Sequence, residues 1–202
     1  NKIRTVGTMP AVLSVFEEVS TELVKTVTIN KSYTVNPKGI TTVVVIDYGL
    51  KGSIVEQLVA KKFKVIVLPS TTTFKTIMSF KPSGVVLSNG PGDPMDLIKE
   101  IHVVKELLAK NVPIFGICLG HQVLALALGA KTYKLPFGHR GINQPVLHQE
   151  TKKAFITTHN HGYSVDGDSL PKNVQVLFTN LNDGTIEGLQ HKTKPWFSVQ
   201  FH

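Results

Sequence analysis

The chain has 202 residues, 42% of them hydrophobic, which is enough to bury a core as one domain or as one domain with an appendage. Its net charge is +8, but the lysines are scattered and no basic run is interleaved with aromatic residues. We therefore expect a solvated basic surface or one that meets an acidic protein partner, and we expect no binding of nucleic acid. No apolar run reaches the roughly 18 residues of a membrane span, and a single cysteine cannot form an internal disulfide, so the sequence favours a cytoplasmic protein with no membrane contact.

The predicted elements differ on the two sides of residue 39. Residues 1–39 are weakly periodic, with a stretch typical of β structure at 24–35. From residue 40, continuous β-branched runs predict buried strands and apolar residues at helical spacing predict helices. Strands are expected at 42–46, 64–68, 84–87 and 114–117, and helices at 51–62, 74–80, 94–108 and 119–128. This alternation is typical of a doubly wound, mostly parallel α/β sheet with flanking helices.

The helix expected at 94–108 carries the clearest start signals in the chain. Asp93 is suited to cap it and Pro94 to occupy its first position, and Glu100 is expected to lie away from its apolar stripe. Beyond Gly129, shorter β segments are expected to extend the sheet or to form an antiparallel edge, at 131–135, 154–157, 174–179, 185–190 and 196–201.

Cys118 is the only cysteine, and it lies between an expected strand and an expected helix with a glycine two positions away on each side. This is the thiol form of the Gly-x-Ser-x-Gly nucleophile elbow, in which the glycines permit a sharp turn that presents the side chain above the sheet edge. The partial positive charge of the helix N-terminus favours thiolate over thiol. A buried structural cysteine is the alternative, but it does not require both glycines. We therefore predict that Cys118 is a nucleophile.

The loop at 88–94, SNGPGDP, is expected at the same edge of the sheet as the elbow, where ligands bind in α/β folds. Its two glycines let backbone N–H groups approach a ligand closely, so the loop is suited to donate one arm of an oxyanion hole. The N–H of Leu119 is expected to supply the other arm. An ordinary turn explains the loop equally well by itself, and the neighbouring elbow favours function.

A cysteine nucleophile requires a base, usually a histidine distant in sequence. His121 lies on the elbow helix and is better explained as a packing or hydrogen-bonding residue. His159 and His161 flank Asn160 in a polar stretch that is expected to be a loop, and His202 ends the last predicted strand. From the residues alone, His202 and the 159–161 stretch are equal candidates. No sequence feature indicates that the remaining histidines lie near Cys118. These are His102, His139, His148 and His191.

Several of these motifs together resemble a known family. GICLGHQ at 116–122, NGPGDP at 89–94 and the final Phe-His pair are similar to the class I, triad-type glutamine amidotransferases. The stretches 137–145, 160–166 and 183–185 are most similar to the glutaminase (small) chain of carbamoyl-phosphate synthase. The resemblance covers about 40–202, which is identified as the amidotransferase domain, with the flavodoxin-like fold of that family. It implies that 1–39 is a remnant of the small chain's N-terminal domain with a linker, because 2–8 resembles the tail of that domain.

The resemblance implies hydrolysis of the side-chain amide of glutamine to glutamate and ammonia. Cys118 would form a thioester with the substrate, His202 would pass a proton to the departing ammonia, and the amides of Gly92 and Leu119 would hold the oxyanion. The implied glutamine pocket is formed by Gly90, Gly92, Leu119, Gln122, Asn160, Gly162 and Tyr163. A turn explains Gly162, and core packing explains Tyr163, without this role.

The implied partners are L-glutamine and the large chain of carbamoyl-phosphate synthase, which would receive the ammonia. No phosphate-binding Gly-x-x-x-x-Gly-Lys-Ser/Thr loop occurs, so we expect no cofactor and no metal in this chain, and ATP and magnesium only on the large chain.

Two features of the family are missing from the 202 residues: the carboxylate two positions after the histidine, and a glutamine-binding serine from the N-terminal domain. We therefore expect a truncated piece that is catalytically weakened by itself. Two other interpretations stay open: an amidotransferase or γ-glutamyl hydrolase with a different acceptor, and a catalytically silent regulatory partner domain. The stretches 137–145 and 160–166 disfavour the first, and the retained cysteine disfavours the second.

Overall fold

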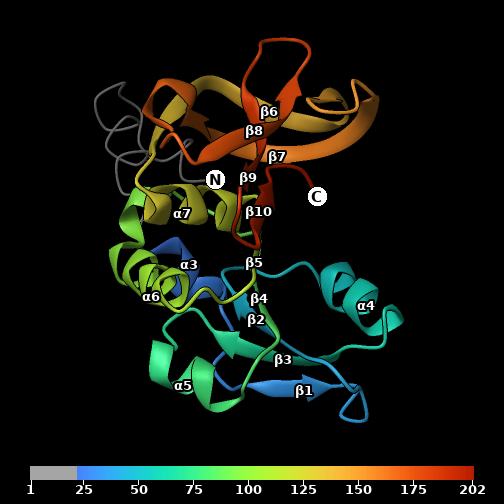
Figure 1. Cartoon of the computed structure of the whole chain (residues 1–202), viewed down its shortest axis with the longest axis vertical. Helices are drawn as coiled ribbons and strands as arrows, with labels where there is room; N and C mark the ends of the chain where they lie inside the picture. Colours follow the sequence, from blue (N-terminus) through green and yellow to red (C-terminus); the bar gives the residue numbers. More distant parts are fainter. Residues whose placement is uncertain (1–21) are drawn as a thin grey trace, which may run out of the picture.

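A computed structural model of the chain describes residues 22–202, so the resemblance noted at 2–8 lies outside the described residues. One ten-stranded sheet has the order β1-β3-β2-β4-β5-β10-β9-β8-β6-β7 (Figure 1). Its strands are β1 Tyr33–Val35, β2 Thr42–Asp47, β3 Lys64–Pro69, β4 Gly84–Leu87, β5 Ile114–Ile117, β6 Lys131–His148, β7 Ala154–Asp166, β8 Val174–Asn180, β9 Ile186–His191 and β10 Trp196–Val199. The helices are α3 Leu23–Val27, α4 Gly52–Ala60, α5 Phe74–Ser79, α6 Ile98–Ala109 and α7 Leu119–Leu128, with 3-10 turns at Pro94–Asp96 and Gly167–Ser169.

The centre of the sheet is parallel. Strands β3, β2, β4, β5 and β10 pair in parallel register, and their order matches the 2-1-3-4-5 arrangement of flavodoxin-like sheets. Every residue of β2 after Thr42 is buried, as its continuous apolar run predicts for a strand covered on both faces. The predicted fold class is confirmed.

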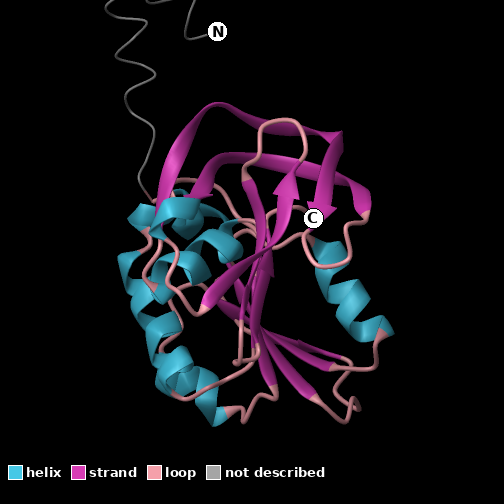
Figure 2. Cartoon of the chain, turned by 45° about the horizontal axis from the view of Figure 1, so that its top comes forward, coloured by secondary structure: helices cyan, strands magenta, loops and turns pink. Residues whose placement is uncertain are grey.

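Helices cover both faces of this parallel centre. Figure 2 shows α4 on one side of the sheet and the remaining helices on the other. Val55 of α4 packs with Val45 and Val67, whereas Leu107 of α6 and Leu124 of α7 pack with the opposite side chains of the same strands. Helix α7 is buried around almost its whole circumference because it lies between the sheet, α6 and β7. No helix within residues 22–202 is long and apolar enough to cross a bilayer.

Antiparallel strands extend the sheet at both ends. Strands β9, β8, β6 and β7 follow β10, and β1 pairs with β3 at the other edge. Strands β6 and β7 are far longer than predicted, and the 159–161 stretch expected to be a loop lies inside β7. The reason is cross-strand pairing: His161 is opposite His139, and Asn160 is opposite Arg140.

Three further predictions were wrong in detail. Asp93 accepts a hydrogen bond from the Met95 amide and caps only the 3-10 turn, whereas α6 begins at Ile98, because Leu97 departs from helical geometry. Glu100 is buried instead of facing solvent. The stretch 24–35, predicted as β structure, forms α3 followed by the short strand β1.

Candidate active site

Cys118 forms a strained turn between β5 and α7. Its φ of +54° and ψ of −105° lie outside the regions that residues with a side chain normally occupy, at a cost of about 1–3 kcal/mol. The Cys118 amide donates to the Val199 carbonyl at 2.9 Å, which fastens the turn to β10. The predicted strand, elbow and helix are all present, and such strain is typical of a residue held for function.

Both glycines of the elbow are required by close backbone approach. A Cβ atom on Gly116 would lie 2.5 Å from the Gly120 carbonyl oxygen, and one on Gly120 would lie 2.1 Å from the Leu87 carbonyl oxygen. The Gly120 amide also donates to the Ser88 carbonyl at 3.0 Å. The first turn of α7 is therefore pressed directly against the end of β4.

A cavity of about 360 Å³ opens above the elbow. All nine residues assigned to the site from the resemblance line it: Gly90, Gly92, Cys118, Leu119, Gln122, Asn160, Gly162, Tyr163 and His202. Five others complete the wall: Gly49, Asn89, Pro91, Arg140 and His161. Gly49 was missed although it follows a parallel strand at the ligand-binding edge, and this position in the fold was the available signal.

The loops after β2 and β4 support one wall of the cavity. Asp47 is buried, and its carboxylate accepts hydrogen bonds from the amides of Gly49 and Leu50 at 2.8 and 2.7 Å. The Asn89 side chain donates to the Gly49 carbonyl at 2.9 Å. Gly90 has no room for a side chain, because a Cβ atom there would lie 2.2 Å from the Tyr48 carbonyl oxygen.

Burial dominates the electrostatics of Cys118. Desolvation raises the pKa of the thiol to about 11, although the nearby Leu119 amide, Gln200 side chain and Gly90 amide act to lower it. The Leu119 amide at the helix N-terminus thus acts in the predicted direction, towards the thiolate, but burial outweighs it. The two amides that act on the sulfur, those of Leu119 and Gly90, come from the elbow and from the loop after β4.

His202 is the histidine with a free ring nitrogen at this cavity. Its amide donates to the Thr158 carbonyl at 3.1 Å, and its buried Nδ1 has no hydrogen-bond partner among the described residues. Burial and the neighbouring Lys51 ammonium lower its pKa, so the imidazole is neutral at neutral pH and able to accept a proton. His121, in contrast, is fully buried with Nδ1 2.8 Å from Ser198 Oγ, as expected for a packing residue.

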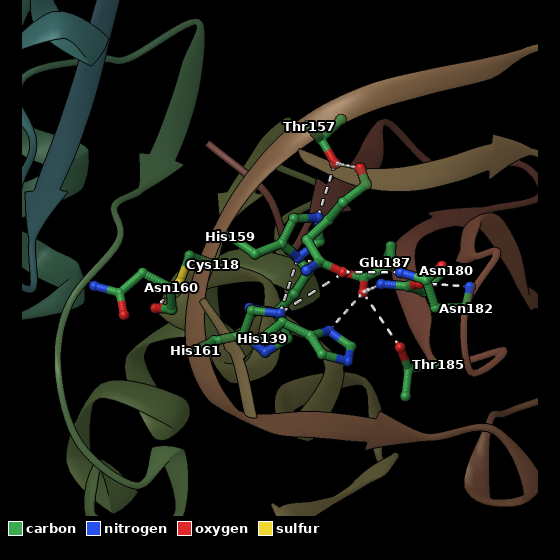
Figure 3. A network of polar contacts seen from close by, with 12 residues as sticks. Cys118, His139, Thr157, His159, Asn160, His161, Asn180, Asn182, Thr185 and Glu187 are labelled. Carbon is green, nitrogen blue, oxygen red and sulfur yellow. Dashed lines mark hydrogen bonds and ion pairs between the residues drawn. The ribbon is translucent and has the colours of Figure 1, made fainter. Parts of the chain in front are cut away.

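Gln122 and Asn160 present polar atoms to the cavity in different ways. The Gln122 side-chain nitrogen donates to the Tyr163 carbonyl at 2.8 Å and to Gln200 Oε1 at 2.9 Å, so only its carbonyl oxygen is left to accept from a ligand. The main-chain carbonyl of Asn160 accepts a weak hydrogen bond from the Cys118 thiol, with an S···O distance of 3.9 Å. Figure 3 shows the Asn160 side chain pointing away from the neighbouring histidines, on the side where Cys118 lies.

A second polar cluster lies behind β7. His139, His159, His161 and Glu187 bring their side-chain donor atoms within 4.8 Å of one another, and these are residue types that hold metal ions. Burial lowers the pKa of His159 to about 4 and that of His161 to about 3, and raises that of Glu187 to about 7. The sequence indicated the 159–161 stretch but gave no reason to join it to His139 or Glu187.

A strained cysteine elbow over a flavodoxin-like sheet, with a histidine in the same cavity, defines the class of protein. The model of the family described as "Glutamine amidotransferase class-I" matches residues 44–202, and the chain belongs to that family. Within it, the chain is similar to proteins named carbamoyl phosphate synthase small chain. It is 50% identical over 161 residues to that of Symbiobacterium thermophilum, covering 79% of this chain and 44% of the relative. It is 44% identical over 219 residues to that of Chlorobaculum tepidum, covering all of this chain and 60% of the relative.

The chain thus spans about half the length of the curated relatives that it matches. Among solved structures, a glutamine amidotransferase from Thermotoga maritima superimposes with a TM-score of 0.63 at 22% identity, covering 80% of this chain and 75% of that one. At this identity the similarity supports the fold alone.

Proposed function

We propose that this chain is the glutamine-hydrolysing part of a carbamoyl-phosphate synthase small chain. The observation that carries the proposal is the strained Cys118 elbow, which shares one cavity with the free imidazole of His202. The similarity to proteins named carbamoyl phosphate synthase small chain supports the particular substrate and partner.

In the proposed reaction, the Cys118 sulfur attacks the side-chain carbonyl carbon of glutamine. His202 accepts the thiol proton during this attack, because a thiol with a pKa of about 11 is not ionised at neutral pH. The proton then passes to the amide nitrogen, which leaves as ammonia while the thioester forms. Water, deprotonated by the same imidazole, attacks the thioester. The carbon–sulfur bond breaks to release glutamate, and the imidazole returns the proton to the departing Cys118 sulfur.

The negative charge that develops on the substrate oxygen is stabilised by the amides of Leu119 and Gly92. Both residues line the cavity that contains Cys118, and Gly90 borders the same space. Such a donor contributes roughly 100- to 1000-fold in rate. The Gln122 carbonyl oxygen is suited to accept from the α-ammonium group of glutamine, and Asn160, Gly162 and Tyr163 border the same space.

The ammonia is proposed to pass to the large chain of carbamoyl-phosphate synthase in the cytoplasm. ATP and magnesium would act on that chain, and the hydrolysis itself would use no cofactor. The basic surface of this chain, with its net charge of +8, suits an acidic face on the partner.

The test uses the full-length parent protein with its large chain, because this chain spans only about half of its relatives. We expect Cys118→Ser to abolish glutamine-dependent carbamoyl phosphate synthesis while ammonia-dependent synthesis is unchanged. A glutamine-analogue electrophile should label Cys118 in the parent protein. Equal loss of both syntheses would contradict the division of labour, and an unlabelled Cys118 would favour a silent domain. Faster hydrolysis of γ-glutamyl peptides than of glutamine would favour a γ-glutamyl hydrolase.

A further inference from the structure

The cluster behind β7 joins three strands through four side chains. His139 comes from β6, His159 and His161 from β7, and Glu187 from β9. His139 Nδ1 lies 3.2 Å from Glu187 Oε1, and His159 Nδ1 and His161 Nε2 lie 3.4 and 4.0 Å from Glu187 Oε2. The side chains of His159 and Glu187 are fully buried, and those of His161 and His139 are 2% and 12% exposed. Figure 3 shows these groups converging.

The outward ring nitrogen of each histidine is bound to an atom that accepts hydrogen bonds. His139 Nε2 lies 2.8 Å from the Asp183 carboxylate, and His161 Nδ1 lies 2.9 Å from the Tyr163 carbonyl oxygen. His159 Nε2 lies 2.8 Å from the Thr157 hydroxyl, which donates its own hydrogen to the Gln144 carbonyl. His139 and His161 therefore carry a proton on the outward nitrogen, and their inward nitrogens bear a lone pair. His159 can carry its proton on either nitrogen, because the Thr157 hydroxyl both donates and accepts.

The centre of the cluster is rich in groups that can ligate a cation. The inward nitrogens of His159 and His161 are 3.0 Å apart, a distance that suits either a hydrogen bond from His159 or ligation of one cation by both nitrogens. Glu187 Oε2 points into the same space and is buried without a hydrogen-bond partner among the described residues. Its other oxygen already accepts from Asn180 and Thr185. The unpartnered Oε2 and the neighbouring imidazole nitrogens are suited to hold a cation.

We propose that His139, His159, His161 and Glu187 bind one zinc ion. Zinc with bonds of about 2.0–2.1 Å to nitrogen and oxygen has tetrahedral ligand-to-ligand distances of roughly 3.3 Å. His161 Nε2 and Glu187 Oε2 lie 3.0 and 3.4 Å from His159 Nδ1, close to that value, and the donor atoms of all four residues lie within 4.8 Å of one another. Imidazole ligands select zinc over magnesium and calcium. Outward hydrogen bonds from ligating histidines to carboxylate or carbonyl groups are the usual second layer of a zinc site.

This zinc ion has a structural and positioning role. Four protein ligands close the coordination shell, so no position is left for an activated water. His159 and His161 face the ion, whereas Asn160, between them, faces the cavity that contains Cys118, which His161 also borders. The ion therefore fixes β7 against β6 and β9 directly behind the wall of the glutamine site. This proposal departs from the sequence-based expectation that the chain holds no metal.

The test is a zinc titration of the chelator-treated full chain, followed by competition with a chromophoric chelator. We expect one zinc ion per chain, a raised thermal midpoint on binding, and intense visible absorption of tetrahedral type when Co²⁺ replaces zinc. His159→Gln should weaken zinc binding by about 100-fold or more, and Asp183→Asn, which removes an outward partner, by about 10- to 100-fold. His102→Gln, on the exposed side of α6, is the matched control and should bind zinc as the parent does.

None of these measurements depends on glutamine hydrolysis, so the zinc site and the proposed function fail separately. Absence of saturable zinc binding by the parent chain would overturn the proposal and leave a shared proton as the cation. So would a weak, octahedral Co²⁺ spectrum, or parent-like affinity in His159→Gln. If circular dichroism shows that His159→Gln does not fold, the parent Co²⁺ spectrum and Asp183→Asn decide the question.

Discussion

Gly120→Ala is the sharpest test of how the elbow is built. Gly120 is the second residue of α7, and its missing side chain lets the helix contact the end of β4 directly. An alanine Cβ would lie 2.1 Å from the Leu87 carbonyl oxygen and 2.7 Å from Leu87 Cβ. Both neighbours belong to a buried strand, so the helix must move away by about 1 Å, and the variant is overpacked.

The expected loss of stability can be summed from three effects. Overpacking costs about 1–3 kcal/mol, and stretching the hydrogen bond from the Gly120 amide to Ser88 costs about 0.5–1.5 kcal/mol. The higher helix propensity of alanine returns up to about 1 kcal/mol. The free energy of unfolding should therefore fall by about 2 kcal/mol, which lowers the thermal midpoint by roughly 4–8 °C for a chain of this size. Glutamine hydrolysis should fall about 100-fold, because a 1 Å displacement of the nucleophile has an effect of that order.

Gly52→Ala is the matched control, since Gly52 also opens a helix but has no atom within 4 Å of the place where a Cβ would lie. Urea unfolding and glutaminase assays on both variants give the comparison. Gly52→Ala should be as stable as the parent or up to about 1 kcal/mol more stable, with unchanged activity. The reasoning fails if Gly120→Ala unfolds within about 0.5 kcal/mol of the parent, or if both variants lose the same stability.

The remaining predictions concern the thiol and the pocket. Burial raises the pKa of Cys118 to about 11 from an ordinary 9.0. Iodoacetamide should therefore alkylate Cys118 in the folded chain at pH 8 about 100-fold more slowly than a free thiol, and the alkylation rate should rise about tenfold per pH unit. A rate that reaches a plateau near pH 7 would contradict this. A raised folded pKa gives stability that is complete below pH 9 and is lost as the pH rises towards 11, on the order of 2 kcal/mol. Urea unfolding at pH 8 and 10.5 should show this loss in the parent but not in Cys118→Ser, and equal loss in both would assign it to other groups. Gln122→Met removes the side-chain N–H groups that donate to the Tyr163 carbonyl and to Gln200 Oε1. The variant should lose about 1–3 kcal/mol of stability and show a raised KM for glutamine. An unchanged KM would show that Gln122 does not contact the substrate.

Local signals in the sequence predicted the parallel half of the fold well. The run at 42–46 and the glycines around Cys118 act through neighbouring residues, so a short window contains the information. The 159–161 stretch was wrongly predicted as a loop because its polar side chains are satisfied by β6 and β9, which no short window contains. The raised pKa of Cys118 could not be predicted from the sequence for a similar reason. The helix terminus is visible in sequence, whereas the burial that outweighs it depends on the whole fold.

The alternation of side chains along β7 has a consequence for how the chain can change in length. Asn160 faces the cavity, whereas His159 and His161 converge on Glu187 behind it, and His161 also borders the cavity. A single inserted residue near Thr157 would exchange the faces, placing the histidines towards the substrate and the amide among the strands behind it. One added residue would thus disrupt both places at once. We expect tolerated insertions to be confined to the exposed hairpin turn at 149–153, where an extra residue leaves the phase of the strand intact.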